Sequence, residues 1–154
     1  MERILVSSCL LGARVRYDGR AKTSDSEILT RWRAEGRLVP FCPEVAGGLP
    51  VPRPAAEITG DLVLTRDGQD VTGFFTRGAQ LALETARAHQ IRLAILKEGS
   101  PSCGSHRIGD GTFSKTHIPG AGLTARLLSR HGIRVFSEDE LPAADTYLRE
   151  ILGK

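Results

Sequence analysis

Short apolar runs alternate with amphipathic segments along the chain, an order typical of strands alternating with helices. Continuous apolar runs predict strands at 3–8, 37–42, 91–98 and 133–137. Apolar residues spaced by three or four predict helices at 24–35, 71–89, 122–132 and 139–152. This alternation predicts an α/β chain, a three-layer Rossmann-like fold with a mainly parallel sheet. The length of 154 residues fits one domain over 1–154.

Prolines, glycines and possible helix-capping serines make this prediction more specific. Pro40 lies inside the second strand, which favours an edge position and the strand order 2-1-3-4. Ser24 or Ser26 is the expected cap of the first helix, and Asp67-Gly68 the expected turn of a small hairpin. The Pro- and Gly-rich segments 43–60 and 99–120 are predicted to be long irregular loops. In such sheets ligands bind beyond the carboxyl ends of the strands, here between the first and third strands.

Composition and charge restrict the kind of partner. The net charge is +3 and the pI about 9.0, which suits a small anionic ligand but is too small an excess to indicate polymeric nucleic acid. No apolar run approaches the roughly 20 residues that span a bilayer. The start of the chain, with Glu2 early and its apolar stretch broken by Ser7 and Ser8, does not resemble a signal peptide, so we expect a cytoplasmic protein.

The three cysteines share one kind of position. Cys9, Cys42 and Cys103 each follow a predicted strand, and each lies beside Gly, Pro or Ser. An odd number of cysteines in a reducing compartment argues against a disulfide framework. Because parallel strands end at one edge of the sheet, all three thiols are expected to converge on one crevice.

Several chemistries would explain such thiols. Isolated cysteines also pack as small apolar residues. Zinc sites usually bring cysteines in close pairs, which are absent here, although zinc with His106 as a fourth ligand stays open. A cysteine nucleophile would need a base, and His106 is the histidine in the right loop. Three thiolates would also hold a [4Fe–4S] cluster with one iron left open. Composition does not choose between a hydrolase, an iron–sulfur enzyme and a non-catalytic module that senses redox state.

Longer motifs do select one of these options. The segments "VSSCLLGARVRYDG", "PFCPEVAGGLPVPRPAAEI", "DVTGFFTRGA", "AILKEGSPSCG" and "DGTF" closely resemble the domain of unknown function 523 family, in the family's order and over nearly the whole chain. The resemblance implies a thiouracil desulfidase that acts on thiolated uracil or 4-thiouridine monophosphate. It also implies a [4Fe–4S] cluster held by Cys9, Cys42 and Cys103. The chain departs from the family at Val15, where a cysteine is often found, and at Gly109, where an aromatic residue is common.

The hypothesis that the chain is a desulfidase assigns roles to residues near the cysteines. Glu44 follows Cys42 by two positions and is expected to do the acid–base work on water and on the ring nitrogen. Ser100 and Ser102 flank Pro101 beside Cys103, and one of them is expected to bind the ring oxygen or a water. We group these three as candidate catalytic residues.

Substrate binding is assigned to basic, aromatic and glycine residues around the same loops. Tyr17 is expected to stack on a pyrimidine ring. A glycine pair at the start of helix 122–132 is expected to favour a phosphate. The full set of candidate substrate-binding residues is Tyr17, Arg14, Arg16, Arg53, Lys97, Gly120 and Gly122.

Overall fold

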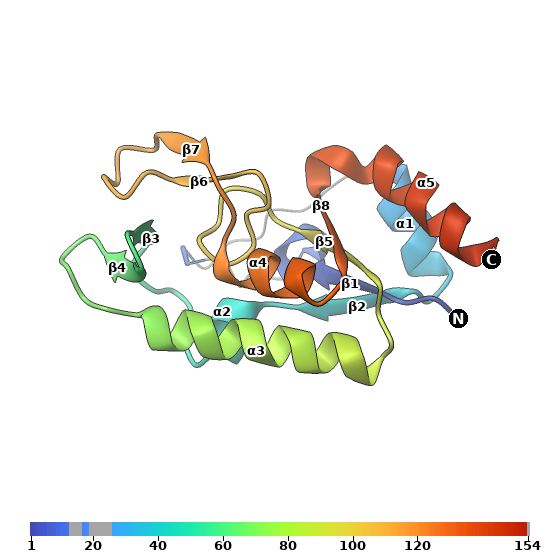
Figure 1. Cartoon of the computed structure of the whole chain (residues 1–154), viewed down its shortest axis with the longest axis horizontal. Helices are drawn as coiled ribbons and strands as arrows, with labels where there is room; N and C mark the ends of the chain where they lie inside the picture. The colour runs from blue at the N-terminus through green and yellow to red at the C-terminus, as the bar shows by residue number, and fades with distance from the viewer. Residues whose placement is uncertain (13–16, 19–25, 154) are drawn as a thin grey trace.

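The computed structural model describes residues 1–12, 17–18 and 26–153 (Figure 1). Its elements, in chain order, are β1 (Ile4–Ser7), η1 (Ser8–Leu11), α1 (Glu27–Ala34), β2 (Leu38–Phe41), α2 (Pro43–Ala46), β3 (Ala56–Thr59), β4 (Leu62–Thr65), α3 (Thr72–Ala88), β5 (Leu93–Leu96), β6 (Arg107–Gly109), β7 (His117–Pro119), α4 (Leu123–Arg130), β8 (Arg134–Ser137), η2 (Glu138–Glu140) and α5 (Leu141–Leu152). Arg14 and Arg16, and Ser24 as a helix cap, lie outside the described residues.

The main sheet has four parallel strands in the order β2-β1-β5-β8. This is the predicted order 2-1-3-4, so the α/β fold class and the sheet topology are confirmed. β2 is an edge strand, as Pro40 requires, because proline has no N–H to donate to a second neighbour. The point where the strand order reverses lies between β1 and β5, which places any ligand site beyond their carboxyl ends.

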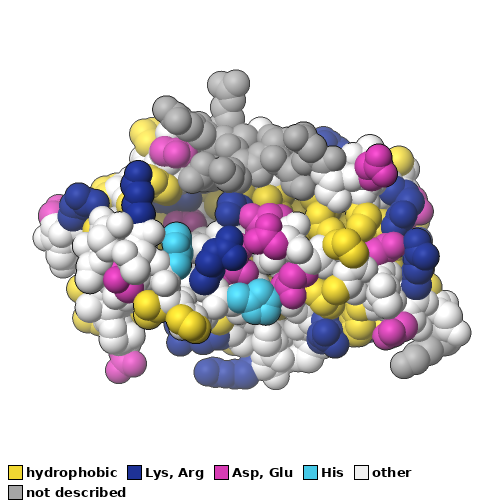
Figure 2. Space-filling model, turned by 90° about the horizontal axis from the view of Figure 1, so that it is seen from above, with side chains coloured by type: hydrophobic (Ala, Val, Ile, Leu, Met, Phe, Trp, Pro, Cys, Tyr) yellow, Lys and Arg dark blue, Asp and Glu magenta, His cyan; other side chains and the backbone are white. Residues whose placement is uncertain are grey.

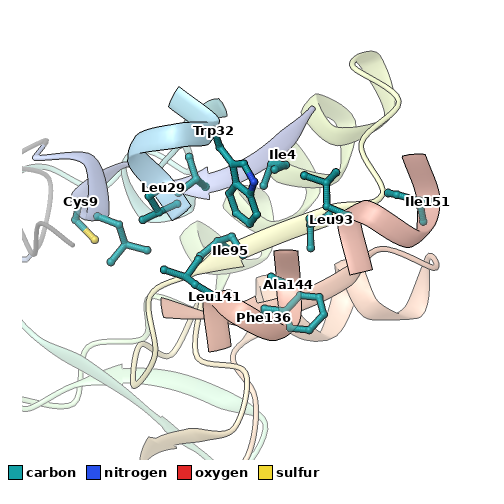
Figure 3. Close-up of a cluster of buried hydrophobic side chains, with 13 residues drawn as sticks. Ile4, Cys9, Leu29, Trp32, Leu93, Ile95, Phe136, Leu141, Ala144 and Ile151 are labelled. Carbon is teal, nitrogen blue, oxygen red and sulfur yellow. The ribbon is translucent and has the colours of Figure 1, made fainter. Parts of the chain in front are cut away.

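Two apolar clusters attach helices to opposite faces of this sheet. Ile4, Val6 and Ile95 point to the side covered by α1 and α5, where Trp32 is fully buried (Figure 3). Leu5, Ala94 and Leu96 alternate to the other side, which α3 and α4 cover. Because both faces are covered, the central strands β1 and β5 are buried at every position and apolar at all but Ser7, and the layers are helix, sheet, helix.

The predicted helices are present with shifts of a few residues at their ends. α3 runs over Thr72–Ala88 and α4 over Leu123–Arg130, close to the expected 71–89 and 122–132. Ser26 caps α1 by accepting a hydrogen bond from the N–H of Ile28 at 3.2 Å. Among the described residues no helix is both long enough and apolar enough to cross a bilayer.

The two segments predicted as irregular loops contain short elements instead. The first holds α2 and strand β3, which pairs with β4 through a turn at Gly60-Asp61. The predicted turn at Asp67-Gly68 is also present: the chain returns antiparallel to β4, with a bridge between Leu64 and Asp70 and a hydrogen bond from the N–H of Thr65 to the carbonyl of Gln69 at 2.9 Å. The second holds the antiparallel pair β6–β7. We call β3–β4 and β6–β7, with the loop 110–116, the hairpin cap. Figure 1 shows it at the end of the molecule away from both chain termini.

Candidate functional site

The three cysteines meet at the predicted edge of the sheet. Cys9 lies in η1 directly after β1, Cys42 directly follows β2 and is the N-cap of α2, and Cys103 lies in the loop after β5. All three are free thiols and line one cavity of about 560 Å³. Cys9 and Cys103 are 7% and 5% exposed, and Cys42 is half-buried. The walls come from the sheet on one side and the hairpin cap on the other.

The loop that carries Cys103 is built around the hydroxyl of Ser100. Its Oγ accepts hydrogen bonds from the N–H groups of Ser102 and Cys103 at 3.0 and 3.1 Å. The Cys103 thiol is hydrogen-bonded to Ser7, whose Oγ also accepts from the N–H of Lys97 at 2.9 Å. The ends of β1 and β5 therefore fix the position of this sulfur together.

A buried carboxylate that the sequence reading missed organises the same loop. Glu98 is 3% exposed, and its Oε1 accepts hydrogen bonds from the N–H groups of Gly99, Ser105, His106 and Arg107 at 2.9 to 3.3 Å. Burial alone would raise the pKa of this carboxyl, but these backbone donors outweigh it and lower the pKa. The sequence feature that could have indicated this role is an acidic residue directly after an apolar strand and before a run of small residues, whose N–H groups need acceptors.

Glu44 lies on α2, two residues after Cys42, and lines the cavity. Its Oε1 is 3.4 Å from the Nε of Arg53, whose side chain is only 2% exposed. The hydroxyl of Ser100 is also bonded to this carboxylate. Burial raises the pKa of Glu44, opposed by the Arg53 guanidinium and by Ser100. Glu44 thus sits between a fixed cation and the loop that carries Cys103.

Three other predicted residues also line the cavity. Arg53 is anchored by its Nη1, which donates to the carbonyl of Pro50 at 3.1 Å, and by its N–H, which donates to the carbonyl of Tyr17 at 2.7 Å. Lys97 forms an ion pair with Glu138 at 2.8 Å. Tyr17, Arg53 and Lys97 are therefore placed where the sequence reading expected them.

Ser102, Gly120 and Gly122 do not line the cavity. Ser102 is fully buried, with its Oγ 2.7 Å from the hydroxyl of Thr124. The expected phosphate site at the start of α4 is replaced by a packing contact. There the N–H groups of Gly122, Leu123 and Thr124 donate to the backbone carbonyls of Gly104, Pro101 and Ser102. A Cβ on Gly122 would lie 2.5 Å from the backbone of Ser102. The helix start therefore binds the cysteine loop rather than an anion, which corrects the expectation for both glycines.

The hairpin cap contributes residues that the sequence reading did not select. Cavity-lining residues from the cap and its flanks are Glu57, Arg66, Arg107, Phe113, Lys115 and His117. Glu57 joins the two hairpins, because its Oε1 accepts from the N–H groups of Gly111 and Phe113 at 2.9 and 3.2 Å. Gly109 lies against this carboxylate, and a Cβ there would be 2.5 Å from its Cδ. Figure 2 shows basic, histidine and acidic side chains mixed on one face of the molecule. The described residues of the cap include only two buried apolar side chains, Val63 and Ile108, so the cap leaves a much weaker apolar pattern than the sheet does.

The described residues give little support to the cysteine-hydrolase or zinc alternatives. Burial raises the pKa of the Cys103 and Cys42 thiols, whereas a nucleophilic cysteine needs a lowered pKa. His106 is bonded to Glu140 at 2.7 Å and does not line the cavity. No group of three His, Cys, Asp or Glu side chains in the described part of the chain is arranged to hold a single metal ion. A cluster of several irons spreads its ligands over a wider space than one ion does, so three thiols around one cavity fit such a cluster.

Comparisons with known proteins agree with this arrangement. A protein-family profile described as 2-thiouracil desulfurase matches residues 4–140. The chain is 43% identical over 148 residues to the uncharacterized protein YbbK of Bacillus subtilis (strain 168), covering 90% of this chain and 97% of that protein. It is also similar to a solved structure named [4Fe-4S]-dependent thiouracil desulfidase TudS (DUF523Vcz). The identity is 56%, the TM-score 0.95, and the match covers 97% of this chain and 99% of the other.

Proposed function

The chain belongs to the 2-thiouracil desulfurase family, and we propose that it is an iron–sulfur-dependent desulfidase that converts a thiolated pyrimidine into its oxo form. The observation that carries the proposal is the convergence of three cysteines, from the segments that follow three separate strands, on one cavity. The substrate is thiouracil or 4-thiouridine monophosphate. An iron–sulfur enzyme whose three cysteines form no disulfide suits a reducing compartment, so we propose a cytoplasmic location.

The proposed cofactor is a [4Fe–4S] cluster whose protein ligands are Cys9, Cys42 and Cys103. Thiolates are the usual ligands of such clusters, and three of them leave one iron without a protein ligand. When bound, the cluster supplies a thiophilic position that accepts the sulfur atom. The buried Ser7 hydroxyl fixes the sulfur of Cys103 and the half-buried Ser100 hydroxyl fixes its backbone N–H, so the loop is held before any ligand enters.

The chemistry assigned to the protein's own residues is proton transfer. Oxygen from water forms a bond to the ring carbon, the carbon–sulfur bond breaks, and sulfur leaves as sulfide. Glu44 takes a proton from the attacking water and passes it to the ring nitrogen as negative charge develops on the ring. When the carbon–sulfur bond breaks, that proton and the remaining proton of the water leave with the sulfur, so water and the thiolated ring give the oxo form and hydrogen sulfide. Arg53 holds one carboxylate oxygen of Glu44, and Ser100 bonds the same carboxylate, so both act as positioning residues. Ser102, buried against Thr124, has no part in this scheme.

Substrate binding is assigned to Tyr17 and Lys97, together with Arg53, because all three line the cavity beside the cysteines. Arg14 and Arg16 stay in the proposal on the basis of the sequence alone. The ion pair of Lys97 with Glu138 fixes its ammonium group near the carboxyl end of β5. A nucleotide would use the ammonium group of Lys97 for its phosphate, whereas a free base would leave this group paired with Glu138.

The test is anaerobic reconstitution with iron and sulfide, followed by iron analysis, a visible spectrum and sulfide release from 2-thiouracil. The wild-type protein is expected to show the broad charge-transfer absorption of a thiolate-bound cluster and to release sulfide. We expect the cluster absorption and the sulfide release to be lost in each of three variants, Cys9→Ser, Cys42→Ser and Cys103→Ser. Full iron and sulfide content in all three variants would reject the ligand set. A stable cluster in wild type without sulfide release would support a redox sensor instead.

Glu44→Gln tests the proton-transfer role. The amide keeps the shape of the side chain, so cluster content is expected to match wild type. Turnover is expected to fall by about 10²- to 10⁴-fold, the usual span for a lost general acid–base group. Iron content, melting temperature and single-turnover sulfide release are measured on the same sample. Wild-type turnover in a cluster-loaded variant would exclude Glu44, while a loss of cluster would show that its carboxylate only holds the loop.

A further inference from the structure

Phe113, in the hairpin cap, is held in a backbone conformation that its residue type rarely adopts. Its φ is +58°, in the left-handed region that bulky side chains avoid. Two contacts impose this conformation: its N–H donates to Glu57 Oε1 at 3.2 Å, and its carbonyl accepts from Arg66 Nη2 at 3.0 Å. Such conformations persist only where the surroundings fix them, and they cluster at ligand sites.

These contacts direct an aromatic ring into the cavity. Phe113 is half-buried and lines the same cavity as the three cysteines. The guanidinium of Arg66 lies over its ring, 5.6 Å from the centroid, and restrains its orientation. Glu57 bonds the backbone of both Gly111 and Phe113, so the two hairpins are joined without help from the ring. If Phe113 served only to join the hairpins, its ring would not need to line the cavity.

We propose that Phe113 is the stacking platform that binds the flat pyrimidine ring of the substrate. This inference rests on the proposed desulfidase function and names a specificity-determining residue for it. A pyrimidine offers two π-faces, and stacking on an aromatic side chain binds it without using its exocyclic oxygen or sulfur. Phe41, also in the cavity wall, packs against the apolar cluster on the α3 and α4 side of the sheet. Among the described residues, the other phenylalanine and tyrosine side chains that line the cavity are Phe113 and Tyr17, which belong to neither core cluster.

The test compares Phe113→Leu and Phe113→Tyr in the cluster-loaded enzyme. Leucine keeps an apolar side chain but removes the π-face, whereas tyrosine keeps the ring. For Phe113→Leu we expect KM for 2-thiouracil and the Kd for uracil to rise by about 5- to 150-fold, the range of base–aromatic stacking. The value of kcat is expected to stay within about twofold, because stacking binds the ground state and the transition state alike. Phe113→Tyr is expected to match wild type in all three.

Two further variants separate binding from folding. Phe74→Leu removes an exposed phenylalanine of α3 that does not line the cavity, and it is expected to change nothing. Phe113→Asn removes the ring with a residue that tolerates the left-handed region, so it is expected to keep cluster content and melting temperature while its KM rises like that of Phe113→Leu.

The outcomes distinguish this proposal from the proposed function. Uracil has no sulfur, so its binding reports on stacking whether or not sulfide is released. If the wild-type enzyme releases sulfide but Phe113→Leu and Phe113→Asn keep the wild-type KM and Kd, the platform is rejected and the desulfidase stands. If KM rises in Tyr17→Leu but stays at the wild-type value in the Phe113 variants, the stacking role of Phe113 is likewise rejected. If the wild-type protein binds uracil through Phe113 but releases no sulfide, the platform stands and the desulfidase function fails.

Discussion

The parallel sheet and the hairpin cap are ordered by different forces, although both form the walls of one cavity. The strands of the sheet are apolar at nearly every position and are covered by helices on both faces. In the cap, all three residues of β7 are exposed, and the polar atoms of two carboxylates, Glu57 and Glu98, join the segments. Burial therefore positions the strand ends next to Cys9 and Cys42, whereas hydrogen bonds to carboxylates position the loop that carries Cys103 and the hairpin cap.

This difference predicts where stability and activity respond separately. Removing apolar volume from the sheet should lower the free energy of unfolding and leave the cavity intact. Weakening a carboxylate contact should loosen one wall of the cavity at a smaller cost in global stability. Phe113 and Glu44 would then be held by hydrogen bonds and ion pairs whose loss a measurement of global stability alone does not reveal.

The largest expected effect on stability is that of Ile95→Ala. Ile95 is fully buried on β5, packs on the α1 and α5 side, and does not line the cavity. Isoleucine-to-alanine changes in cores cost about 2–5 kcal/mol because they leave a cavity. We expect such a loss in chemical denaturation and, at a temperature where the variant is folded, wild-type kcat and cluster content. A lowered kcat in the folded variant would show that the sheet core and the site are not separable.

Glu98→Gln is expected to have a smaller effect on stability and a larger one on the cysteine loop. The glutamine keeps one oxygen but loses the charge that strengthens the bonds from Ser105, His106 and Arg107. Hydrogen bonds to charged groups contribute about 1.5–3 kcal/mol each, and the remaining oxygen keeps part of this, so a loss of about 1–3 kcal/mol is expected. Amide hydrogen exchange at these three residues should accelerate, while exchange in β5 should not.

The stability difference between wild type and Glu98→Gln is also expected to depend on pH in a definite direction. Because the pKa of Glu98 is lowered in the folded protein, its ionised form stabilises the fold at pH values above its ordinary pKa of 4.5. That contribution is lost as the pH falls below 4.5 towards the folded-state pKa. The difference in melting temperature between wild type and Glu98→Gln should therefore be full at pH 6 and shrink below pH 4.5. A difference that stays constant from pH 6 to pH 3 would mean that the charge of Glu98 does not contribute.

The same contrast explains which features the sequence could predict. Continuous apolar runs and Pro40 were enough for the strand order, and the position of each cysteine after a strand was enough for their common cavity. The hairpins carry no comparable pattern, since β7 is exposed and Glu57 acts across 54 residues on Gly111. Ser102 and Gly122 were misread because their partners, Thr124 and the Ser102 backbone, come together only in the folded chain.

Ser102→Ala has the smallest expected effect, and it separates the two serines beside Cys103. Ser102 and Ser100 differ by two positions, yet one hydroxyl is buried against Thr124 and the other faces Glu44 in the cavity. Removing the Ser102 hydroxyl should cost about 0.5–1.5 kcal/mol, the net value of one hydrogen bond, with kcat and KM unchanged. Ser100→Ala is the matched variant: it deletes the acceptor of two backbone N–H groups and the partner of Glu44, so kcat should fall as well as stability. Denaturation and sulfide release measured on both variants decide the matter, because a drop in kcat for Ser102→Ala without loss of cluster would return that serine to the catalytic site.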